Sequence, residues 1–106
     1  MKKILWIAGC TALFAGGVAL AANPVAGKEK SKTCAACHGP DGNSAAPDFP
    51  RLAGQNQDYL VKALSDYKAG DRKNAIMAPQ AANLSKRDID DLAAYFSRQS
   101  GLVVKY

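Results

Sequence analysis

The sequence has very few of the residues that usually bind metals, with one histidine and three cysteines in 106 residues. Cys10 lies inside an N-terminal apolar run, which leaves Cys34, Cys37 and His38 in the rest of the chain. A closed structural zinc site takes four Cys or His ligands, so this chain cannot complete one with such ligands. No segment alternates apolar and polar residues with a period of two, so the pattern does not predict a β-sheet.

The chain also lacks any run of basic residues. Its formal charge is +5, and without Lys2 and Lys3 twelve basic residues stand against nine acidic ones, a charge of +3. The basic residues are scattered among Asp and Glu, which is typical of a solvated surface. Nucleic acid is therefore not an expected partner.

The N-terminus has the composition of an export signal. A short basic start is followed by uncharged residues 4–22, and Ala19-Leu20-Ala21 has the small-x-small pattern of a cleavage site. The pattern predicts a secretory signal peptide over residues 1–22, cut after Ala21 or Ala22, and export to the periplasm. The alternatives are an uncleaved membrane anchor, or a lipoprotein made at Cys10 in "IAGC".

The remaining residues 23–106 are expected to form one small domain. A chain of this size has barely enough core to fold by itself. A disulfide between Cys34 and Cys37 would close a very short loop and restrain the unfolded chain little. The composition therefore indicates a bound group at the centre of the domain.

Apolar spacing predicts an all-α domain with three main helices, over residues 24–37, 57–69 and 85–101. Long loops rich in Gly, Pro and Asn connect them, over residues 39–56 and 70–84. Loops of this length in so small a domain usually wrap something.

Capping residues support these helices. Pro24 suits a first turn, and Asn56 is a good N-cap before the second helix. Gly70 marks the end of that helix. Ser85 and Asp88 have the spacing of a capping box at the start of the third, with Asp in place of Glu or Gln.

The stretch "CAACHGPDG" is the most informative part of the chain. On a helix, Cys34, Cys37 and His38 lie at positions i, i+3 and i+4 and share one face. C-x-x-C-H is the spacing typical of c-type haem attachment. Two thiols one turn apart can each add to one haem vinyl group, and the adjacent imidazole can ligate the iron. The alternative is a dithiol oxidoreductase, which usually needs a βαβ fold that this pattern does not predict.

The second axial position of a haem iron is commonly taken by Met or His. His38 is the only histidine, and Met1 belongs to the predicted signal peptide. This leaves Met77 in the loop "NAIMAPQ", two residues before Pro79. The alternative role for Met77 is to fill a gap in the core.

These motifs together resemble a class I c-type cytochrome. The resemblance runs from "CAACHGPDG" through "FPRLAGQ" and the downstream Met77 to "LSKRDIDDLAAYF", nearly all of residues 23–106. More narrowly, the chain is similar to one half of the dihaem bacterial cytochromes c, here with a single haem. The resemblance implies the class I cytochrome c fold and one haem c held by two thioether bonds.

The resemblance also implies roles that spacing alone does not give. Pro50 matches the family's proline whose carbonyl accepts the N–H of the proximal histidine. Gly27 matches the small residue where the first and last helices cross, against Tyr95 or Phe96. Residues 28–33 depart from the family, because they are almost wholly polar where larger apolar residues are usual.

A haem with two protein ligands has no open site for a substrate, so the expected function is one-electron transfer and not catalysis. Expected partners are a terminal oxidase, a periplasmic reductase or a quinol-oxidising complex, with contact to membranes only through such complexes. If Met77 does not ligate, gas binding or peroxidase chemistry is the alternative. The basic residues considered for docking partners are Lys62, Lys68, Arg72, Lys73, Lys86 and Arg87, and an ordinary solvated role is equally open for each.

Overall fold

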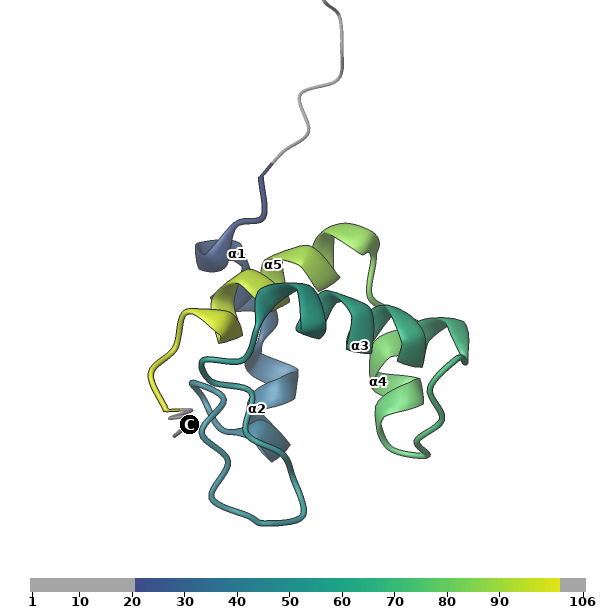
Figure 1. Cartoon of the computed structure of the whole chain (residues 1–106), viewed down its shortest axis with the longest axis horizontal. Helices are drawn as coiled ribbons and strands as arrows, with labels where there is room; N and C mark the ends of the chain where they lie inside the picture. The colour runs from purple at the N-terminus through teal and green to yellow at the C-terminus, as the bar shows by residue number, and fades with distance from the viewer. Residues whose placement is uncertain (1–20, 102–106) are drawn as a thin grey trace, which may run out of the picture.

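The computed structural model describes residues 21–101 and contains five α-helices in that range (Figure 1). In chain order these are α1 Pro24–Lys30, α2 Lys32–His38, α3 Gln57–Ala69, α4 Met77–Ala82 and α5 Lys86–Ser97. This part of the chain holds no β-strand, so the all-α prediction is confirmed. The export signal and Cys10 fall in residues 1–20, outside the described range, and their predicted roles stay predictions.

The prediction of one continuous first helix over residues 24–37 was wrong, because the structure has two helices there, separated at Ser31. The hydroxyl of Ser31 donates a 2.7 Å hydrogen bond to the Lys28 carbonyl, and its N–H is shared between Gly27 and Lys28. Such local bonds compete with the regular helical pattern. The second part then continues to His38, and Gly39, with a φ of +83°, ends it.

Gly27 allows α1 to cross close to α5. A Cβ atom at this position would lie 2.0 Å from the Asp91 carbonyl oxygen and 2.8 Å from the Cβ of Tyr95. Only glycine leaves room for backbones at this separation. Of the two aromatic residues expected at this crossing, the structure therefore places Tyr95 against Gly27. The Tyr95 hydroxyl donates a 2.7 Å hydrogen bond to the Pro40 carbonyl.

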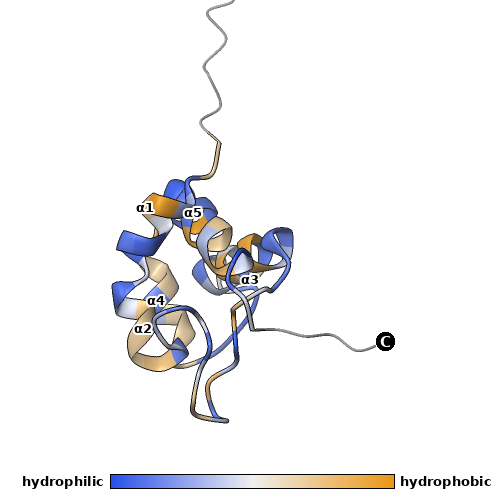
Figure 2. Ribbon diagram, turned by 90° about the vertical axis from the view of Figure 1, so that its left-hand side faces the viewer, coloured by the Kyte–Doolittle hydropathy of each residue, from blue (hydrophilic) through white to orange (hydrophobic). Residues whose placement is uncertain are grey.

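Charge, not apolar contact, holds the polar end of α1 on α5. Figure 2 shows the ribbon changing from orange to blue along α1. The Lys30 ammonium lies 2.7 Å from the Asp91 carboxylate and 3.0 Å from that of Asp88. The N–H of Asn23 donates to Asp91 at 2.8 Å, and Arg87 lies 3.5 Å away. These contacts explain how a first helix that is polar over residues 28–30 still packs on α5.

The buried Asp91 carboxylate, 1 % exposed, stays charged in this network. Burial raises its pKa, but the hydrogen bonds from Lys30 and Asn23, with the charge of Arg87, outweigh burial and lower the pKa. The negative charge of Asp91 is thus compensated by Lys30 of α1 and by Arg87 of α5.

Helices α3 and α5 begin where their caps predict. The Asn56 side chain accepts from the Asp58 N–H, and Gly70 ends α3 in the left-handed region. Both bonds of the Ser85–Asp88 capping box are present. The apolar faces of these helices meet in one core, made by Leu60, Leu92, Ala93, Tyr95 and Phe96.

Helix α4 was missed, because residues 70–84 were predicted to be a loop. It packs against α3 (Figure 1). Helices α2 and α4 lie on the same side of α3, near its opposite ends (Figure 1). Its sequence, "MAPQAA", has no charged residue and a proline in the first turn, so it gives little periodic signal. None of the helices in residues 21–101 is long and apolar enough to span a bilayer.

Candidate functional site

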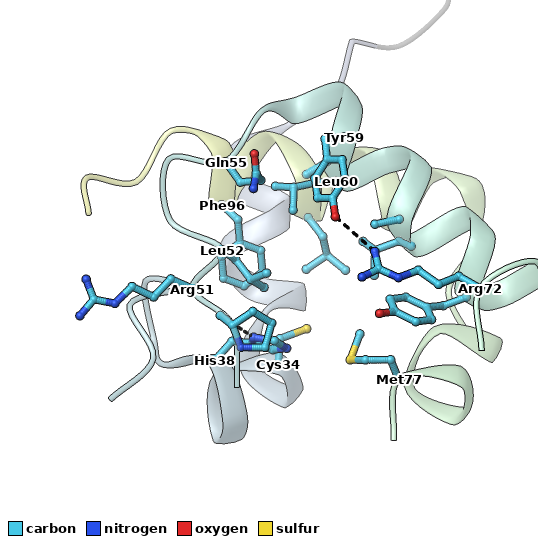
Figure 3. Close-up of a pocket in the computed structure, with 16 residues that line it drawn as sticks. Cys34, His38, Arg51, Leu52, Gln55, Tyr59, Leu60, Arg72, Met77 and Phe96 are labelled. Atoms are coloured by element: carbon cyan, nitrogen blue, oxygen red, sulfur yellow. Dashed lines mark hydrogen bonds between the residues drawn. The ribbon is translucent and has the colours of Figure 1, made fainter. Parts of the chain in front are cut away.

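Helix α2 brings the predicted haem-binding residues to one cavity wall. Cys34 and His38 line two adjoining cavities of about 180 and 380 Å³, and Cys37 lines the larger one. Met77 from α4 lines both cavities as well. In Figure 3 the Met77 sulfur lies across the cavity from His38 and Cys34. The structure therefore brings these four side chains to one space.

The Pro50 carbonyl oxygen lies 2.8 Å from Nδ1 of His38 (Figure 3). A carbonyl can only accept a hydrogen bond, so Nδ1 carries a proton, and in the neutral ring the lone pair is then on Nε2. The ring is 6 % exposed and lies edge-on to Phe49, with 6.5 Å between ring centroids. Such a bond fixes the tautomer and the orientation of an imidazole that ligates a metal. This is the contact that the resemblance implied for Pro50.

Backbone bonds hold the loop that carries Pro50. The N–H groups of Leu52 and Ala53 donate to the Gly42 carbonyl at 2.8 and 3.3 Å. Gly42 has a φ of +83°, and a Cβ there would lie 2.9 Å from the ring of Phe96. The loop thus runs tightly over α5 and presents the Pro50 carbonyl to His38.

The two thiols lie half-buried and unbonded to each other. Burial raises the pKa of the Cys34 thiol. A redox-active dithiol depends on a thiolate with a lowered pKa. The environment of Cys34 thus argues against the dithiol oxidoreductase that the sequence left open.

Met77 was predicted in a loop, and the structure makes it the first residue of α4. Its side chain is half-buried. The carboxamide oxygen of Asn74 accepts the N–H groups of Ile76 and Met77 at 2.9 and 3.0 Å. The backbone that carries Met77 is therefore tied to Asn74.

Arg72 is a site residue that the sequence analysis missed, since it was considered only for partner docking. Its guanidinium stacks 4.8 Å from the centroid of the Tyr67 ring and donates to the Tyr59 hydroxyl at 3.3 Å. It lines both cavities, and Figure 3 shows it in the smaller one beside Tyr59. The contacts join α3 to the loop after it, and no local motif in the sequence announces them.

The other basic residues considered for docking are mostly engaged. Lys62 pairs with Asp66 at 2.9 Å and Lys86 with Asp90 at 3.2 Å, both one turn apart on their helices. The Lys68 ammonium donates to the carbonyl of Leu84. Arg87 lies in the Asp91 network described above, and Lys73 is exposed.

The walls of this site suit a flat, apolar, iron-bearing group. Many of the lining side chains are aliphatic or aromatic, and the polar groups among the rest include two thiols, an imidazole, a thioether and the Arg72 guanidinium. Thiols can attach haem, and imidazole and thioether are its usual axial ligands. Within residues 21–101, no three His, Cys, Asp or Glu side chains are placed to hold a bare metal ion.

Comparison with known proteins agrees with this site. The family model of cytochrome c matches residues 24–100. The chain belongs to the cytochrome c family. A cytochrome c domain has covalently bound haem c, so the predicted cofactor is confirmed, and Cys34 and Cys37 have the spacing that attachment requires.

Several relatives are bacterial cytochromes. Cytochrome c4 of Azotobacter vinelandii is 48% identical over 78% of this chain. The reduced recombinant cytochrome c4 from Pseudomonas stutzeri matches with a TM-score of 0.74 and 48% identity over 78% of this chain. Cytochrome c-554(548) of Halomonas halodenitrificans is 46% identical over 74% of this chain. The predicted class I cytochrome c fold is confirmed.

The relatives differ in length. This chain covers 44% of the Azotobacter cytochrome c4 and 48% of the Pseudomonas one, so it spans about half of each. It covers 99% of the Halomonas cytochrome. The chain thus corresponds to one half of the longer relatives and to the whole of a shorter one.

Proposed function

We propose that this cytochrome c is a carrier of single electrons between redox proteins and is not itself an enzyme. The observation that carries the proposal is the arrangement of His38 and Met77, which approach one cavity from α2 and α4. Two such ligands occupy both axial positions of an iron. No position is then open for a substrate.

In this proposal Cys34 and Cys37 attach haem c, and His38 and Met77 ligate its iron. When bound, the haem supplies an iron that changes its charge by one electron. Pro50 keeps the proton of His38 on Nδ1, at 2.8 Å, so that Nε2 stays available as the ligand atom. Because the carbonyl bond fixes the imidazole, His38 would keep its orientation when the iron gains or loses an electron.

Arg72 would be available in the proposed site to pair with an acid group of the haem. Haem has two propionates, and burying a charge without a partner is costly. The Arg72 guanidinium lines both cavities and is oriented by Tyr59 and Tyr67. A guanidinium matches the geometry of a carboxylate better than other cations do.

The proposed location is the periplasm, reached through the predicted signal peptide over residues 1–22, with the mature domain over residues 23–106. Partners are other redox proteins of that compartment, such as a terminal oxidase, a periplasmic reductase or a quinol-oxidising complex. A relative from Stutzerimonas stutzeri, 42% identical over 89% of this chain, has the name thiosulfate dehydrogenase electron acceptor. This name fits a role as acceptor from a periplasmic enzyme.

Carbon monoxide binding separates a carrier from a gas-binding or peroxidase protein. With Met77 on the iron, the reduced protein should bind carbon monoxide more than about tenfold more slowly than the Met77→Ala variant. Stopped-flow absorbance measures both rates. Equal rates in the two proteins would mean that the sixth position is already open, and the carrier function would be rejected.

A further inference from the structure

The segment that carries Met77 has little apolar anchoring before the helix starts. Residues 71–76 are all exposed, and Ile76, next to Met77, is 57 % exposed. Helix α4 itself has six residues, which is too short for an isolated helix to be stable in water. Something other than hydrophobic burial must therefore fix the start of α4.

Asn74 supplies that fixation with three bonds. Its carboxamide oxygen accepts from the N–H of Ile76 at 2.9 Å and from the N–H of Met77 at 3.0 Å. Its backbone carbonyl accepts from Ala78 at 3.0 Å. Ile76 is the residue directly before α4, but Asn74 makes the bonds that a capping side chain makes, and they close the turn that leads into Met77. Without the side chain, the N–H groups of Ile76 and of Met77 itself lose their partner.

The bonds act on the backbone of Met77 itself. A side chain that reaches across a cavity to an iron needs its Cα at a fixed place, and small displacements of a ligating residue are costly. Asn74 lines the larger cavity together with Met77, so cap and thioether belong to one structural unit.

We propose that Asn74 is a positioning residue that keeps Met77 at the haem iron. The inference rests on the proposed function, in which Met77 is the second axial ligand. Loss of the Asn74 cap frees the first turn of α4 and raises the fraction of molecules in which Met77 has left the iron. An added ligand then captures that open state.

Imidazole binding to the oxidised protein measures this fraction. Because imidazole binds only after Met77 leaves, its apparent affinity rises with the open population. The Asn74→Ala variant should bind imidazole about five- to tenfold more tightly than wild type, the effect typical of a lost cap. Asn74→Asp keeps an acceptor oxygen and should stay near wild type.

Asn83→Ala is the matched control, since Asn83 is an exposed Asn at the other end of α4 that makes no side-chain hydrogen bond in the described structure. It should bind imidazole as wild type does. Asn74→Leu has the shape of Asn without the acceptor and should behave as Asn74→Ala, so it serves if the alanine variant is not recovered. Unchanged imidazole affinity in both Asn74→Ala and Asn74→Leu overturns the proposal.

A double-mutant cycle of Asn74→Ala with Met77→Ala separates positioning of Met77 from a general weakening of the fold. In the Met77→Ala background the site is already open, so adding Asn74→Ala should leave imidazole affinity unchanged. An equal increase in both backgrounds would show that Asn74 acts by another route and would reject the inference.

The same data distinguish a failure of Met77 as a ligand from a failure of Asn74 as its positioning residue. If wild type binds imidazole as tightly as Met77→Ala does, Met77 is not a ligand and the proposed function itself fails. If wild type binds weakly and Asn74→Ala does too, only the role of Asn74 fails.

Discussion

At the scale of single residues, the site depends on side chains whose neighbours fix their state. His38 is the clearest case, because the carbonyl of Pro50, 2.8 Å away, decides which ring nitrogen holds the proton. Arg72 is similarly held by the ring of Tyr67 and the hydroxyl of Tyr59. Both residues are thus oriented before any partner protein arrives.

Replacing Arg72 with Gln should lower the reduction potential. A positive charge beside the haem disfavours the oxidised, more positive iron, so its loss stabilises that state. We expect a decrease of roughly 20–60 mV, which is about 0.5–1.4 kcal/mol for one electron. A spectroscopic redox titration measures it.

Lys73→Gln, at the adjacent exposed position, is the control for net charge and should shift the potential less. Equal shifts in the two variants would place Arg72 away from the haem.

The site residues differ in how far the sequence could predict them. Cys34, Cys37 and His38 lie within one turn of helix, so their spacing alone predicts a shared face. Met77 was predicted as the second ligand by elimination, since the chain offers so few residues that ligate haem iron. Arg72 could not be found this way, because its contact with Tyr59 spans 13 residues and forms only when the loop after α3 folds back.

At the scale of helices, the crossing of α1 and α5 is the tightest contact, and Gly27→Ala tests it. The new methyl group would lie 2.0 Å from the Asp91 carbonyl, which is backbone and cannot rotate away. Because the helices must separate, the free energy of unfolding should fall by about 3 kcal/mol. Urea unfolding followed by circular dichroism measures the loss.

Val25→Ala on the same helix is the control for the Gly27 variant. Val25 is 74 % exposed, so the expected change is within about 0.5 kcal/mol. A Gly27→Ala protein as stable as this control would mean that the helices cross less closely than the structure places them.

The ion pairs between α1 and α5 predict a pH dependence of stability. The pKa of Asp91 lies below its ordinary value of 3.8 in the folded protein, so its contribution is complete above about pH 4. That contribution is lost as the pH falls through the lowered pKa. Asp88, whose pKa is also lowered, first by the Ser85 N–H and then by Lys30, acts in the same window.

We therefore expect Asp91→Asn to unfold at lower urea concentration than wild type at pH 7, and the difference to shrink below pH 4. Urea midpoints measured from pH 7 to pH 3 provide the comparison. Asp90→Asn, whose partner Lys86 is exposed, should change the midpoint little at any of these pH values. A gap between wild type and Asp91→Asn that stays constant with pH would contradict the assignment.

The helices were predictable where their ends are marked by local chemistry. The capping box at Ser85 and the cap at Asn56 are short-range signals, and both helices begin there. The break at Ser31 and helix α4 were both missed because neither produces a periodic pattern of apolar residues. Serine also occurs inside helices, so Ser31 did not mark a helix end. Helix α4 is held by the Asn74 side chain and by packing on α3, and both contacts depend on the folded structure.

At the scale of the whole molecule, the buried apolar core is small. Within residues 21–101, four of the nine buried apolar residues are alanines: Ala53, Ala81, Ala93 and Ala94. The smaller cavity lies beside the main core cluster, because Leu92, Ala93 and Phe96 belong to that cluster and also line the cavity. A core of this size gives little stability beyond the cost of ordering the chain.

The protein made without haem should therefore not fold cooperatively. Residues 23–106 produced in a host without haem-attachment machinery should show weak helical circular dichroism and no sharp thermal transition, in contrast to the haem-loaded protein. The physical reason is that the apolar walls on α2, α3 and α4 would face water. A sharp transition with full helix content in the haem-free chain would contradict this.

The absorption spectrum of the haem-loaded protein, oxidised and reduced, shows whether haem is covalently attached and whether Met77 ligates its iron. Covalent attachment keeps the haem on the chain in acidified organic solvent, and ligation by a methionine sulfur gives the oxidised protein a weak far-red band. We expect both in the wild-type protein, and we expect the far-red band to be lost in Met77→Ala. Retained haem without the far-red band in wild type would show that Met77 does not ligate the iron, and the electron-carrier function would be contradicted.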